Sequence, residues 1–219
     1  MHRGLTPPGT TKTSLMRVLW PALAAAVAAL AVAAVGAQAS GGGVSRESGG
    51  LGVTEWTFGS RVLRVGMQGG DVKILNGIVK AKAYGRSVSF SDLFETPTAT
   101  AVREFQRRKA LAPTGVVDAG TATALTQSMR RAGATWYGPG FYGNDTACGK
   151  VLRTTTIGVA HRTLPCGTKV TLSYHGHYLV APVIDRGPYR KGYDWDLTSA
   201  AAQRLGLASS DTVRYAVSG

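Results

Sequence analysis

The sequence is poor in cysteine and in acidic residues. Its 219 residues include two cysteines, too few for a disulfide-scaffolded miniprotein or a four-thiolate zinc site. Asp and Glu total 12 against 25 Lys and Arg, and no Glu follows Glu104. Gly and Pro follow no collagen period, so neither a fibrous nor a wholly disordered chain is expected. The length allows one domain or two small ones and excludes a large enzyme built on a long barrel.

The first 39 residues have the pattern of an export signal. Residues 1–17 are basic without any acid, Val18 to Ala37 carry no charge, and Ala37-Gln38-Ala39 supplies small residues at −3 and −1. These features predict a secretory signal peptide at 1–39, cleaved after Ala39. An uncleaved membrane anchor is the alternative, because about 20 apolar residues just span a bilayer. In both cases the remainder is expected to be secreted or held at the cell envelope.

Positive charge extends over the chain beyond the signal. Residues 40–131 hold 13 Lys and Arg against 7 Asp and Glu, and residues 132–219 hold 9 against 5. This balance favours a polyanionic partner, which for an exported chain is an anionic cell envelope. No nucleic-acid partner is expected, because neither an RNA-binding aromatic signature nor a zinc-finger spacing occurs. A basic surface that serves only solubility is the alternative.

Residues 40–60 are rich in Gly and Ser and predict a linker, after which residues 61–130 predict a helical domain. Apolar spacing predicts helices after Asp71, over 98–109 and over 122–129, with Val102, Phe105 and Leu125 in the core. The segment resembles the peptidoglycan-binding-like domain family, which implies a small all-α bundle that holds cell-wall polymer. The matching strings are Leu63-Arg64-Val65-Gly66, Asp71-Val72, Ala101-Val102-Arg103-Glu104-Phe105-Gln106 and Thr114-Gly115-Val116-Val117-Asp118.

Residues 132–219 change character, because short β-branched runs there alternate with Gly and Pro. This pattern predicts a compact β-barrel or sandwich. The expected strands are Thr154–Val159, Lys169–Leu172, Tyr178–Ile184 and Asp211–Val217. One helix is expected from Thr198 to Leu205, capped by Thr198 and ended by Gly206.

Four strings in this half resemble the RlpA-like double-psi β-barrel family. They are Ala134-Thr135-Trp136-Tyr137-Gly138, Ala160-His161-Arg162-Thr163-Leu164-Pro165, Ile184-Asp185-Arg186-Gly187-Pro188-Tyr189 and Asp194-Trp195-Asp196-Leu197-Thr198. The resemblance implies a six-stranded barrel with a sugar-binding groove, related to expansins and to some lytic transglycosylases. Such transglycosylases cleave peptidoglycan glycan strands without water and leave a 1,6-anhydro sugar.

Asp185 is the expected acid/base of such a reaction. A hydrolytic glycosidase needs two carboxylates, whereas a lytic transglycosylase needs one that donates a proton and takes another back. Asp185 ends an apolar run before a Gly-Pro turn, where a side chain is held at a groove rim. The alternative is that Asp185 caps the turn and pairs with Arg186, which suits binding better than acid catalysis. His161 is the second catalytic candidate, to orient substrate or bond Asp185, and a structural role is its alternative.

Sugar rings stack on flat aromatic side chains, so the aromatic residues near the four strings are candidates for substrate binding. The expected substrate-binding residues are Trp136, Tyr137, Arg186, Tyr189 and Asp196. One position departs from the family pattern, since Lys150 stands where many RlpA-like sequences have Glu. A second carboxylate must then be Asp145, Asp194, Asp196 or Asp211, or be absent.

Cys148 and Cys166 are expected to form a structural disulfide, because the export signal places them in an oxidising compartment. His175 and His177 lie at an expected hairpin tip, and without further ligands no metal or cofactor is expected. The leading hypothesis is an exported protein that binds peptidoglycan glycan strands and cleaves them as a lytic transglycosylase. The alternative is a non-catalytic, expansin-like module that binds or loosens the wall. Oligomeric state cannot be read from the sequence.

Overall fold

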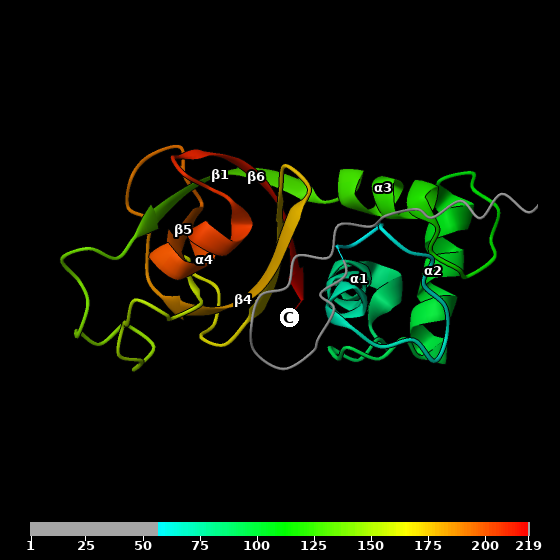
Figure 1. Cartoon of the computed structure of the whole chain (residues 1–219), viewed down its shortest axis with the longest axis horizontal. Coiled ribbons are helices and arrows are strands. Elements are labelled where there is room, and N and C mark those ends of the chain that lie inside the picture. The colour runs from blue at the N-terminus through cyan, green and yellow to red at the C-terminus, as the bar shows by residue number, and fades with distance from the viewer. Residues whose placement is uncertain (1–56, 219) are drawn as a thin grey trace, which may run out of the picture. The chain divides into compact units, whose positions relative to one another are not determined.

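The computed structural model describes residues 57–218, which belong to one compact unit. A helical part comes first, and a closed barrel with a further helix follows (Figure 1). This order confirms the predicted fold class, an all-α bundle followed by a small barrel. The predicted signal peptide at 1–39 and residues 40–56 of the predicted linker lie outside the described residues. Within the described range, no helix is long and apolar enough to cross a bilayer.

The helical part contains α1 (Gly70–Lys80), the short 3-10 helix η1 (Ala83–Gly85), α2 (Thr96–Arg108) and α3 (Ala119–Gln127). The predicted core residues Val102, Phe105 and Leu125 are buried at the centre of this bundle. Phe58, which the sequence places in the linker, is buried in the same core. Asp118 caps α3, because its carboxylate accepts a hydrogen bond of 2.7 Å from the Thr121 amide.

Two buried polar side chains fasten the loops of the bundle. Asp71 is buried at the start of α1 and accepts two hydrogen bonds from the Arg61 guanidinium, at 2.7 and 2.9 Å. Gln106, on α2, donates from Nε2 to the Val116 carbonyl at 2.8 Å and accepts at Oε1 from the Gly115 amide at 2.9 Å. Because buried polar groups are costly unless bonded, these pairs fix the loop positions.

The barrel is built from strands of unequal length whose order in space differs from their order in sequence. Around the closed barrel the order is β1-β5-β2-β4-β3-β6, with the β1–β5 and β2–β4 pairs parallel and the others antiparallel. Their bounds are β1 (Arg130–Tyr137), β2 (Val159–Ala160), β3 (Lys169–Tyr174), β4 (His177–Asp185), β5 (Trp195–Thr198) and β6 (Asp211–Ser218). Closure removes exposed strand edges, which allows strands as short as β2 to persist.

The predicted helix of the C-terminal half is confirmed, as α4 (Ser199–Leu205). Thr198 caps it by accepting from the Ala201 amide, and Gly206 ends it with a left-handed backbone at φ 75°. The strand predicted over Thr154–Val159 is wrong for all but Val159, because Arg153 and Thr156 close a turn instead. Strands β1 and β5 were not among the predicted strands.

The helical part and the barrel are joined directly. Only Ser128 and Met129 separate α3 from β1. The Ser218 hydroxyl on β6 donates to the Gly77 carbonyl on α1 at 2.8 Å, and the hydroxyls of Thr126 and Tyr178 lie 2.8 Å apart. The two parts therefore share a packed and hydrogen-bonded boundary.

Candidate active site

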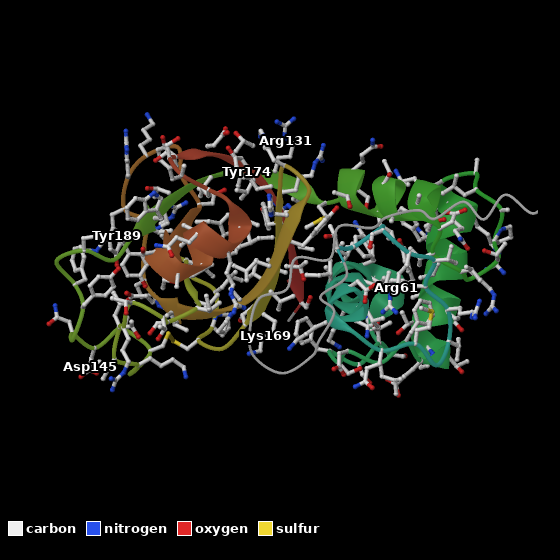
Figure 2. All side chains as sticks on the ribbon, in the orientation of Figure 1. Arg61, Arg131, Asp145, Lys169, Tyr174 and Tyr189 are labelled. Carbon is white, nitrogen blue, oxygen red and sulfur yellow. A yellow bond between two sulfur atoms is a disulfide. The ribbon has the colours of Figure 1, made fainter. Side chains whose placement is uncertain are left out.

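A cleft of about 250 Å³ opens on the barrel beside the ends of β1, β4 and β5. Figure 2 shows Asp145 and Tyr189, both of which line the cleft, at the same end of the barrel. Five of the seven predicted catalytic and substrate-binding residues line this cleft, namely Tyr137, Asp185, Arg186, Tyr189 and Asp196. The complete lining is Tyr137, Phe141, Asn144, Asp145, Thr146, Leu152, Ala160, Asp185, Arg186, Tyr189 and Asp196.

The strand register brings two carboxylates to this cleft. Ala160 on β2 pairs with Asp185 on β4 and, on its other side, with Asp196 on β5. The β2–β4 register shifts between Val159 and Ala160, an irregularity of the kind that redirects side chains near active sites. Because the side chain of Ala160 is only a methyl group, it leaves space in the cleft between the two acids.

Asp185 is held by backbone donors. Its Oδ1 accepts from the Ala147 amide at 2.9 Å and from the Arg186 amide at 2.8 Å. The Arg186 guanidinium turns elsewhere and donates to the Leu164 carbonyl at 3.0 Å. Among the described residues, Asp185 forms no ion pair with Arg186 or with any other cation. The alternative role of Asp185 is thus confirmed in one part, since Asp185 caps the turn through the Arg186 amide, whereas its predicted pairing with the Arg186 guanidinium is not formed among the described residues.

Asp196 has the environment of an acid catalyst. Its carboxyl group is half-buried, and burial first, then the nearby charge of Asp185, raises its pKa to about 6. Its Oδ1 is buried and has no hydrogen-bond partner among the described residues. Such a group keeps its proton at mildly acidic pH.

Tyr137 stands beside both acids. Burial raises the pKa of its hydroxyl, the charge of the Asp185 carboxylate and its interaction with the hydroxyl raise it further, and the charge of Asp196 adds to this. The hydroxyl oxygen is buried and has no hydrogen bond of acceptable geometry within the described chain. Its ring packs edge-on against Phe141, with 6.3 Å between ring centroids. Tyr137 is thus a neutral hydroxyl beside the Asp185 carboxylate at the cleft.

His161 does not line the cleft. Its Nδ1 accepts from the amides of Thr163 and Leu164 at 3.2 and 3.1 Å, and its ring lies 4.8 Å from that of Trp195. Burial, and then the charge of Arg162, lowers the pKa of His161. These contacts are those of a neutral side chain that shapes a turn, although the His161 backbone amide does donate to the Asp185 carbonyl at 3.2 Å.

The predicted disulfide between Cys148 and Cys166 is confirmed. It ties the loop that carries Ala147 to the turn before β3, and the Cys148 amide donates to the Ile184 carbonyl beside Asp185. The disulfide therefore supports the backbone donor that holds Asp185.

The remaining acids of the barrel have other surroundings. Asp194 forms an ion pair with Arg162 at 2.7 Å, and Asp211 accepts from the Tyr174 hydroxyl at 2.8 Å. Asp145 is exposed at the rim of the cleft. Lys150 is exposed and is not part of the lining. Of the four acids considered as a second carboxylate, Asp196 is the one that faces Asp185 across β2.

Trp136, the remaining predicted sugar-binding aromatic, lies outside the cleft. As neighbours on a strand, Trp136 and Tyr137 point to opposite faces, and Trp136 lines a separate hollow beside α4. Tyr189 is 84% exposed on its loop at the rim. Within residues 57–218, no three His, Cys, Asp or Glu side chains are grouped so that they could hold a metal, and this includes His175 and His177.

Comparison with known proteins agrees with this architecture. Residues 130–217 match a family model described as lytic transglycolase, and residues 68–125 match one described as a putative peptidoglycan binding domain. The probable endolytic peptidoglycan transglycosylase RlpA of Synechocystis sp. is 42% identical over 91 residues, 41% of this chain and 28% of that protein. Its counterpart from Aquifex aeolicus is 37% identical over 84 residues, 37% of each chain.

The matches thus span about a third of the relatives' own length. A solved structure, the apo expansin of Clavibacter michiganensis, is 22% identical and covers 40% of this chain and 48% of its own, with a TM-score of 0.33. The chain carries a peptidoglycan-binding-like domain at residues 68–125, and its residues 130–217 belong to the RlpA-like double-psi β-barrel family.

Proposed function

We propose that this chain is an extracytoplasmic cell-wall protein that binds peptidoglycan and cleaves its glycan strands as a lytic transglycosylase. The observation that carries the proposal is the pair Asp185 and Asp196, which flank Ala160 in one cleft with the pKa of Asp196 raised to about 6. The names of the RlpA relatives and the match of the helical part to a peptidoglycan-binding model support the choice of substrate.

In the proposed reaction Asp196 is the acid. Its carboxyl proton passes to the glycosidic oxygen as the bond from that oxygen to C1 of the sugar breaks. The C6 hydroxyl of the same sugar then bonds to C1, and its proton passes to the Asp196 carboxylate, which restores the acid. No water is consumed, and the product carries a 1,6-anhydro ring. One carboxyl group therefore both donates and recovers a proton.

Asp185 then has a supporting role instead of the acid role that the sequence favoured. Its negative charge lies near the breaking bond and raises the pKa of Asp196. A fixed anion also stabilises the positive charge that develops on the sugar ring. We assign His161 to positioning, through the turn that supports Asp185, because its Nδ1 is already bonded.

Substrate contacts are assigned to the residues that remain at the cleft. Tyr137 offers a neutral hydroxyl, and Tyr189 and Phe141 offer exposed rings on which a sugar can stack. Arg186 lines the cleft while its Nη1 bonds the Leu164 carbonyl and its Nη2 contacts Cys166 Sγ, which makes it a fixed wall of the site.

The second candidate is a non-catalytic, expansin-like module that holds or loosens glycan strands with the same cleft. Lys150, which replaces an acid common in RlpA-like sequences, favours this alternative, as does the absence of Glu beyond Glu104. The two candidates predict the same binding and differ only in products.

Incubation with purified sacculi separates the two. The proposal predicts soluble muropeptides whose masses are those of 1,6-anhydro ends, one water lighter than hydrolytic products. Protein that sediments with sacculi and releases nothing identifies the non-catalytic module. Products with ordinary reducing ends would show hydrolysis and contradict the transglycosylase.

A further inference from the structure

Beside the cleft lies a second hollow that the proposed chemistry does not use. It has a volume of about 320 Å³ and is lined by Trp136, Ser199, Ala202, Gln203, Gly206, Leu207 and Ala208. Trp136 comes from β1, and the other residues come from α4 and the turn that follows it. None of the lining side chains is ionisable, so the hollow suits a neutral ligand with apolar faces.

The Trp136 ring is fixed in an orientation that leaves it available. Its indole N–H donates to the Ala208 carbonyl at 3.2 Å, so the polar edge of the ring is already satisfied. The side chain is nevertheless 39% exposed, whereas Ala202 and Leu207 beside it are buried. A rigid, exposed indole over a small apolar floor is a stacking surface, and the Gln203 amide and Ser199 hydroxyl at its margin, 3.3 Å apart, offer hydrogen bonds.

The hollow and the cleft lie on either side of the end of β1, with Trp136 lining the one and Tyr137 the other. Gly138 follows Tyr137, and a Cβ at Gly138 would lie 2.6 Å from the Tyr142 hydroxyl and 2.9 Å from Ser199 Cβ. Tyr142, which adjoins the cleft residue Phe141, and Ser199, which lines the hollow, therefore meet over Gly138. Phe141, Tyr142 and Trp136 are all exposed aromatic residues along this path.

We infer that the Trp136 hollow is a distal sugar subsite, in which a glycan strand that occupies the cleft continues past Tyr142 and stacks on Trp136. The inference rests on the proposed function, since the occupant is a further sugar unit of the same strand. It also gives Trp136 a place in binding even though it lies outside the cleft. A strand held on both sides of its scissile bond is cut within its length.

The consequence is a dependence on strand length. A short oligosaccharide fills the cleft alone, whereas a longer one reaches both the cleft and the hollow. Loss of the indole should therefore weaken only the binding of long strands, by about 10-fold if one stacking contact is lost. Trp136→Phe keeps an aromatic face and should recover most of the affinity.

The test is a titration of the full chain with peptide-free glycan strands, sorted by length from one disaccharide to eight. Wild type, Trp136→Ala and Trp136→Phe are compared, and thermal unfolding of each verifies the fold. The inference predicts that Trp136→Ala weakens binding of the longest strands about 10-fold and leaves the disaccharide unchanged. Gly138→Ala, which crowds the path between the two hollows, should have the same selective effect.

Two other results have different meanings. Equal affinity of wild type and Trp136→Ala for every length, or an equal loss at every length, overturns the subsite and leaves the proposed function standing. Absence of binding to strands of any length overturns the proposed function itself. Because the readout is binding, the subsite is tested whether or not the chain cleaves its ligand.

Discussion

Asp185 and Asp196 are both register partners of Ala160, one through the parallel pairing of β2 with β4 and the other through the antiparallel pairing of β2 with β5. Adjacent strands lie about 4.8 Å apart, so the backbones of the two acids are separated by two strand spacings, about 10 Å. Side chains that converge from such positions approach closely enough to interact. Burial raises the pKa of Asp196, and the charge of Asp185 raises it further.

The pH dependence of cleavage follows from Asp196. Its pKa is raised to about 6, so the protonated acid is present below that pH and is lost above it. We expect the rate of anhydro-muropeptide release to fall as pH rises through about 6. Asp185→Asn removes a charge that raises this pKa, so the falling limb of the residual activity should move to lower pH. If the pH at which activity falls is unchanged or higher in Asp185→Asn, the charge of Asp185 does not raise the pKa of Asp196.

The stability of the fold should also depend on the ionisation of Asp196. The folded state favours the proton on Asp196, so the ionised carboxylate destabilises the fold above about pH 6 and has little effect near pH 4. Solvent screens part of this penalty because the group is partly exposed. Asp196→Asn should raise the melting temperature at pH 7.5 by about 2–4 °C and change it little at pH 4. The control Asp194→Asn removes only a partly exposed ion pair with Arg162, so a similar gain in that variant would contradict the explanation.

Reduction of the Cys148–Cys166 disulfide should affect both stability and activity. The bridge closes a loop with a sequence separation of 18, and its loss should cost about 3 kcal/mol of unfolding free energy. The loop also carries the Ala147 amide that donates to Asp185. We expect the Cys148→Ser/Cys166→Ser variant, measured well below its melting temperature, to bind sacculi but to cleave more slowly. An unchanged rate would mean that the loop holds Ala147 in place without the bridge.

Lys150 should matter little to catalysis in this chain. It is exposed and absent from the cleft lining, so its charge acts on the acids only through solvent. Lys150→Glu should change the cleavage rate by less than about 5-fold, as expected for a screened surface charge. A cleavage rate about 100-fold higher in Lys150→Glu would show that an acid is required at this position. It would favour the hypothesis that the chain with Lys150 is a non-catalytic module.

Much of the fold could be predicted because local patterns and matched strings agreed. The α4 helix has a capping Thr198 and a terminating Gly206, and α2 and α3 have apolar residues at helical spacing. Strands β1 and β5 gave weaker signals, since β5 has only four residues and β1 begins with charged residues. Had β1 been predicted as a strand, simple alternation would have separated Trp136 from Tyr137.

The roles of the two acids could not be predicted in the same way. The sequence indicated Asp185 as the acid from its place at a strand end, and Asp196 as a sugar contact and as one of four candidates for a second carboxylate. What distinguishes them is burial and register, which bring Asp196 under the charge of Asp185 and leave its Oδ1 without a partner in the described chain. The sequence did contain one signal for Asp196, which lies between two apolar residues, Trp195 and Leu197, that are buried in the barrel. Because side chains alternate along a strand, Asp196 lies on the opposite face of β5 from these two residues.

The central claim is that Asp196 donates and recovers the proton, and the most direct test is release of anhydro-muropeptides from sacculi by two matched variants. Asp196→Asn removes the acid, while Asp194→Asn makes the same chemical change two residues away at the Arg162 ion pair. The account predicts that Asp196→Asn sediments with sacculi like wild type but releases product at least ~100-fold more slowly, whereas Asp194→Asn stays close to wild type. Equal release by the two variants would contradict it.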